Sequence, residues 1–197
     1  MPWYRDTPVN GDLRKASNIL TEFEGLKSTQ RQNLIAAYIT RLFLKGGFEI
    51  VPQPDGSKPR MLVKDLPDTA APDDDNDTKL ESELHSFIKE AAGDDRILQK
   101  NELRRWSRYN GRTLYAWSNR IENGATVWTM KPEEVRQVFG LRKFLKDFTL
   151  IKDRGVVEVK LWNDYLVFAS LYGIADQVIK DFRKVCPEYF RRFTFQT

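Results

Sequence analysis

Apolar side chains recur at helical spacing along most of this 197-residue chain, and caps or glycines separate the apolar stretches. The clearest stretch, 13–24, lies between a predicted cap at Asp12 and a stop at Gly25. The same signals predict further helices from Thr29 to Gly46, from Thr78 to Gly93, around 103–106, from Gly111 to Asn123, from Pro132 to about 150, from Val157 to Gly173 and from about 174 to 185. We therefore expect a mainly helical protein.

Strand signals are short and few. Phe48–Val51 and Arg60–Lys64 flank an Asp-Gly turn and predict a β-hairpin. A short extended piece is expected at Ile97–Leu98, and a strand at Thr126–Met130, which is rich in β-branched and aromatic residues. The predicted fold class is mainly α with small β-hairpins, that is, α+β.

The order of these elements suggests how the chain is divided. Helix, turn, helix and hairpin follow one another in residues 1–65, which is the order of a winged helix. Similar elements recur in 78–131, so we predict tandem winged-helix-like units joined by an acidic linker at 66–77. Residues 132–197 would form a helical C-terminal segment packed on the second unit.

Charge is distributed unevenly along the chain. The formal net charge of +4 divides into +3 for residues 1–65, −6 for 66–101 and +7 for 102–197. Prolines and like charges in the acidic stretch predict a solvated linker. Asp73, Asp75 and Asp77 resemble the start of a calcium loop, but Thr78 and Leu84 replace the required glycine and glutamate.

Little in the sequence points to catalysis, a metal or a cofactor. His85 is the only histidine, so it has no second histidine for a metal pair or a nucleophile relay. Cys186 is the only cysteine, and it has no histidine in its own neighbourhood to activate it as a nucleophile. Phosphate-loop and hydrolase motifs are absent. The longest nearly uncharged apolar run, Tyr165–Ala175, is too short to span a bilayer, and the N-terminus carries no secretion signal. We expect a protein without enzymatic activity.

The most distinctive surface feature is a cluster of basic and aromatic residues. Its core is Arg104, Arg105, Trp106, Arg108 and Arg112, and Lys100, Tyr109 and Arg120 lie close by in the sequence. Arginines beside exposed rings suit nucleic acid, because they neutralise phosphates while the rings stack on bases. The alternative is that the tryptophans are buried and the arginines cover a solvated face. Basic faces are also attracted to anionic membranes, by about 1 kcal/mol per cation near the surface.

Four segments resemble a known family. The segments 141–154 and 161–178 look like the C-terminal signature of the predicted bacterial membrane proteins catalogued as domain of unknown function 2207. Residues 4–13, and Ile97–Leu98 with Glu102, Leu103 and Trp106, also resemble that family. The resemblance implies a membrane-anchored parent protein with this chain on the cytoplasmic side, and it implies no catalytic residues.

Two functional hypotheses follow. The first is a non-enzymatic cytoplasmic module that acts through an unidentified protein partner or through proximity to an anionic membrane surface. The alternative is a nucleic-acid-binding protein that uses the cluster around Trp106. Neither hypothesis requires a cofactor, and the sequence indicates no particular oligomeric state.

Overall fold

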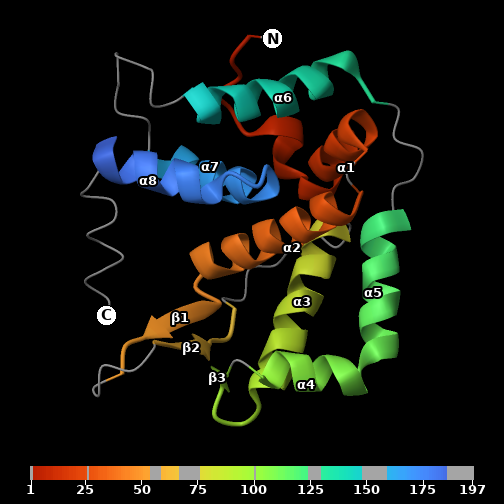
Figure 1. Ribbon diagram of the computed structural model, residues 1–197, viewed down its shortest axis with the longest axis vertical. Coiled ribbons are helices and arrows are strands. Elements are labelled where there is room, and N and C mark those ends of the chain that lie inside the picture. The colour runs from red at the N-terminus through yellow and green to blue at the C-terminus, as the bar shows by residue number, and fades with distance from the viewer. Residues whose placement is uncertain are drawn as a thin grey trace. The chain divides into compact units, whose positions relative to one another are not determined.

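The computed structural model describes residues 2–25, 27–53, 59–66, 76–99, 101–123, 130–147 and 159–185. Within these ranges the chain forms eight α-helices, one short 3-10 helix and a three-stranded antiparallel sheet (Figure 1). The prediction of a mainly helical α+β protein is confirmed. No described helix is long and apolar enough to cross a membrane.

The helices begin and end close to the predicted signals. Helix α1 spans Leu13–Glu24, and Oδ1 of Asp12 accepts a hydrogen bond from the backbone N–H of Lys15 at 2.8 Å. The helix ends at Gly25, whose φ of 69° is the left-handed conformation that glycine adopts without strain. The other helices are α2 (Lys27–Leu44), α3 (Asn76–Ala92), α4 (Glu102–Tyr109), α5 (Gly111–Asn123), α6 (Pro132–Asp147), α7 (Val159–Leu171) and α8 (Ala175–Val185).

The predicted hairpin is present, and a third strand extends it. Strand β1 (Phe48–Val51) pairs with β2 (Arg60–Val63), and β2 pairs with β3 (Ile97–Leu98), in the order β1-β2-β3. The winged-helix arrangement of these elements stays a prediction. Most of the strand predicted at 126–130 lies outside the described residues.

Internal contacts divide the chain into two compact units. One unit contains residues 1–40 together with 125–196, and the other contains 41–124, so that the boundary falls inside α2. The predicted limits of the winged-helix-like units and of the linker stay predictions. Buried apolar side chains are present in both units, for example Leu13 and Leu141 in the first and Leu80 and Trp117 in the second.

In the first unit, the N-terminal segment lies against α6 and α7. The Tyr165 hydroxyl donates to the backbone oxygen of Arg5 at 2.5 Å, and the Thr7 hydroxyl donates to Asp164 at 2.6 Å. Burial raises the pKa of Tyr165 to about 12. A Cβ at Gly140 would come within 2.8 Å of the Cβ of Tyr4, so glycine permits this close packing inside α6.

Helix α3 is the centre of the second unit. Trp117 of α5 is 3% exposed, and its Nε1 donates to the backbone oxygen of Leu80 at 3.0 Å. The Trp117 ring also makes an edge-to-face contact with Phe87. Helix α5 therefore runs back along α3, as Figure 1 shows, and α4 connects the two.

A buried charge cluster joins the end of α2 to α3 within this unit. Asp77 and Glu81 are 4% and 1% exposed. Nη1 of Arg41 lies 3.2 Å from Oδ2 of Asp77 and 3.3 Å from Oε2 of Glu81, and Nζ of Lys45 lies 2.6 Å from Oε1 of Glu81. Asp77, assigned from the sequence to the solvated acidic stretch, is thus a buried ion-pair partner.

Candidate interaction surface

The predicted basic cluster lies on α4 and at the start of α5. Arg104, Arg105 and Arg108 are exposed on α4, and Arg112 is exposed in the first turn of α5. No described carboxylate pairs with Arg104, Arg108 or Arg112. Arg105 makes only a long contact, 3.9 Å, with Glu102 of the same helix. We call these four residues the arginine face.

Arg112 lies in the first turn of α5, where a cation does not stabilise the helix. The N-terminal end of a helix carries partial positive charge, so a cation in the first turn does not stabilise that helix. By contrast, Arg108 lies in the last turn of α4, where a cation is favourable. Helix stabilisation therefore explains one of these two arginines, and Arg112 adds to a positive potential that its helix does not require.

Trp106, the fifth predicted residue, does not share the exposure of the arginines. Its ring stacks on Phe87 with centroids 5.1 Å apart, and its Nε1 donates to Oε2 of Glu90 at 3.1 Å. Trp106 is only partly exposed, whereas Tyr109 is 85% and Tyr115 is 70% exposed. The rings available to a partner are therefore the two tyrosines, and Trp106 attaches α4 to α3.

Of the two other basic residues of the predicted cluster, the structure describes Arg120, which is held in an ion pair. The guanidinium of Arg120 donates to both carboxylate oxygens of Glu83 on α3, one of them at 2.9 Å. This pairing raises the pKa of Arg120 and commits the side chain to the α3–α5 contact. Lys100 lies outside the described residues.

An open hollow borders the arginine face. Arg104, Arg105 and Arg108 line it together with Gln99, Asn101, Glu102 and Tyr109. Three guanidinium groups against one carboxylate make its lining basic. Its chemistry is that of a surface for anionic groups.

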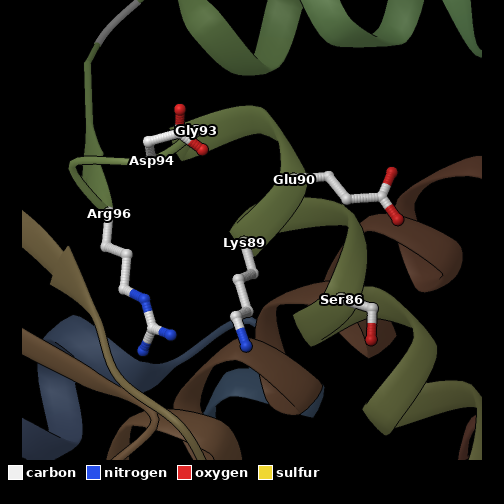
Figure 2. Close-up of a pocket in the computed structure, with 6 residues that line it drawn as sticks. All are labelled: Ser86, Lys89, Glu90, Gly93, Asp94 and Arg96. Carbon is white, nitrogen blue, oxygen red and sulfur yellow. The ribbon is translucent and has the colours of Figure 1, made fainter.

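A second hollow lies at the end of α3, and sequence reasoning did not identify it. Ser86, Lys89, Glu90, Gly93, Asp94 and Arg96 line it, and Figure 2 shows the side chains of Lys89 and Arg96 running in the same direction. Both cations contact one carboxylate, that of Asp65. Nζ of Lys89 lies 2.6 Å from its Oδ1, and Nη1 of Arg96 lies 2.6 Å from its Oδ2.

The two cations stabilise the ionised form of Asp65. Hydrogen bonds from Lys89 and then from Arg96 lower the pKa of Asp65 to about 2. The side chain is 62% exposed, so the carboxylate is ionised at physiological pH in any case, and the two cations extend its ionisation to more acidic pH. Asp65 is 24 residues from Lys89 and 31 from Arg96, and no motif links it to them.

Of the two residues considered for catalysis, His85 and Cys186, the structure describes His85. His85 is 5% exposed beside Phe48, and its Nε2 has no hydrogen-bond partner among the described residues. Cys186 lies outside them. In the part of the chain that the structure describes, no group of three or more histidine, cysteine or acidic side chains is placed to hold a metal ion.

Comparison with known protein families gives a match over the C-terminal part of the chain. Residues 127–182, about a quarter of the chain, match the model of the C-terminal domain of a predicted membrane protein family, DUF2207. No curated protein and no solved structure matches the chain. The match supports the family resemblance predicted from 141–154 and 161–178, and this family is one of predicted membrane proteins of unknown function. A membrane-anchored parent protein is consistent with it.

Proposed function

We propose that this chain is a non-enzymatic, cytoplasmic part of a membrane-anchored protein, and that its arginine face contacts the anionic surface of the membrane. The observation that carries the proposal is the exposure of four arginines, three of them without a described carboxylate partner, beside two exposed tyrosines. Guanidinium groups bind the phosphates of lipid headgroups, and tyrosine rings favour the interface between headgroups and acyl chains.

The family match favours a membrane over a protein or nucleic-acid partner for these same residues. A chain derived from a membrane protein stays close to the bilayer, so a few weak contacts act at high effective concentration. Base stacking on Trp106, the feature that most favoured nucleic acid, would require this ring to leave Phe87 and Glu90.

Neutralising the arginine face should weaken binding to anionic vesicles. We expect R104Q/R105Q/R108Q to reduce partitioning onto phosphatidylserine-containing vesicles by about 100- to 200-fold at low salt, because each of the three cations contributes on the order of 1 kcal/mol. Co-sedimentation with vesicles, repeated with purely zwitterionic lipid, measures this effect.

A matched variant controls for net charge. R60Q/K146Q/K180Q also removes three positive charges, but from exposed positions outside the arginine face. This variant should retain most of the binding. Equal losses in the two variants would show that net charge alone is responsible. Absence of binding by the unmodified protein, or tighter binding to duplex DNA than to vesicles at the same salt concentration, would reject the membrane proposal.

A further inference from the structure

We propose that Lys89 and Arg96 form a binding site for phosphate-monoester dianions, and that Asp65 occupies this site as an internal competitor. The site is separate from the arginine face. It lies where the end of β2, the end of α3 and the turn before β3 meet, all within the unit formed by residues 41–124.

The geometry is that of a two-point anion clamp. Lys89 contacts one oxygen of Asp65 and Arg96 contacts the other, each at 2.6 Å. Cations from two different elements thus converge on one anionic group at the rim of an open hollow. The separate oxygens of a phosphate group can accept from an ammonium and a guanidinium in the same way.

Charge favours a dianion over the resident carboxylate. Two cations face one negative charge on Asp65, whereas a phosphate monoester carries about −1.5 to −2 at pH 7. Two further acidic residues line the hollow, but Figure 2 shows the side chains of Glu90 and Asp94 directed away from the two cationic groups. Glu90 is in addition engaged by Nε1 of Trp106.

Backbone hydrogen bonds fix the position of Arg96. Arg96 has a φ of 56°, a left-handed conformation uncommon for arginine, at the end of the 93–96 turn. Its backbone oxygen accepts from the N–H of Val63 at 2.8 Å, and its N–H donates to the oxygen of Gly93 at 3.2 Å. The backbone of Arg96 therefore stays in place if Asp65 releases the side chain.

The resident carboxylate is weakly held and can be displaced. Exposed ion pairs contribute little net stability, because both charges are well solvated when apart. The side chains of Asp65, Lys89 and Arg96 are 62%, 41% and 42% exposed. A ligand anion would therefore compete with Asp65 for the two cations without unfolding any element.

Removing the competitor should open the site. In the R104Q/R105Q/R108Q background, which removes three of the four charges of the arginine face, we expect D65N to bind inorganic phosphate about tenfold more tightly than its Asp65 parent. NMR titration at pH 8 and constant ionic strength measures this, with the backbone N–H of Arg96 and the indole N–H of Trp106 as reporters. Adding R96Q or K89Q to D65N should abolish the gain.

Each outcome decides the proposal. Equal phosphate affinity of D65N and its parent, or a gain that survives R96Q, would overturn it, as would acetate binding as tightly as phosphate. If D65N loses its native amide dispersion, D65S provides the same test. A soluble phosphate monoester is then distinguished from a lipid headgroup as the ligand by measuring the binding of glycerol phosphate and, separately, of vesicles that contain phosphatidic acid. Because three of the four arginines of the arginine face are already replaced in both proteins compared, failure here leaves the membrane proposal untouched.

Discussion

Replacing Arg41 by methionine should lower the free energy of unfolding by about 3 kcal/mol, because it removes the guanidinium that faces two buried carboxylates. Asp77 and Glu81 are almost fully buried, whereas Arg41 keeps 19% of its side chain exposed, so we place the loss at the lower end for a broken buried pair. Urea denaturation followed by circular dichroism gives the free energy, and hydrogen exchange in α3 locates the change.

Lys45 provides the matched control for Arg41. It contacts Glu81 at 2.6 Å, but 40% of its side chain is exposed and it does not contact Asp77. K45M should therefore cost much less than R41M. Similar losses for the two variants, or a negligible loss for R41M, would contradict the interpretation of Arg41 as the main counter-charge.

Replacing Trp117 by alanine should cost about 3–5 kcal/mol, the range for truncating a large buried aromatic side chain. The substitution removes the contact with Phe87, leaves the Leu80 oxygen without its indole donor and opens a cavity between α3 and α5. Because α5 carries Arg112 and Tyr115, this loss should also weaken vesicle binding. The measurements are urea denaturation and the vesicle assay.

Two further substitutions, W117F and W106A, are compared with W117A. W117F retains most of the apolar volume and loses the indole N–H, so it should cost clearly less than W117A. W106A should cost less than W117A, because Trp106 is only partly buried. An unchanged free energy of unfolding in W117A would contradict the role of Trp117 in holding α5 on α3.

Local signals explain why the helix limits were predictable. The Asp12 cap, the Gly25 stop and the apolar spacing between them act within a few residues, and α1 begins and ends where they indicate. The hairpin limits follow in the same way from the strand content on either side of Asp55-Gly56. Such features need no knowledge of the rest of the chain.

Long-range pairings were not predictable from the same signals. Nothing in the composition of Ile97–Leu98 indicates that it pairs with β2, more than 30 residues earlier. The packing of the N-terminal segment on α6 and α7 depends on single contacts such as Tyr165 with Arg5, which no periodicity reveals. The contacts of Asp65 with Lys89 and Arg96 are of the same kind.

The arginine face shows how far sequence reasoning reaches on function. Charge density alone identified Arg104, Arg105, Arg108 and Arg112, because clustered arginines with one nearby acidic residue, Glu102, are visible in a sequence. The orientation of Trp106 was not visible, because burial of a ring depends on what packs against it. Because Trp106 stacks on Phe87, the exposed rings near the arginines are those of Tyr109 and Tyr115.

The most direct test of the membrane proposal is to determine which surface faces the lipid. A fluorophore is attached at Tyr109→Cys or, on strand β2 of the same unit, at Arg60→Cys, each in a Cys186→Ser background, and the protein is bound to phosphatidylserine vesicles. We expect the label at position 109 to shift to shorter wavelength and to be quenched by a headgroup quencher, while the label at position 60 is unaffected. A response at position 60 and none at position 109 would contradict the membrane proposal.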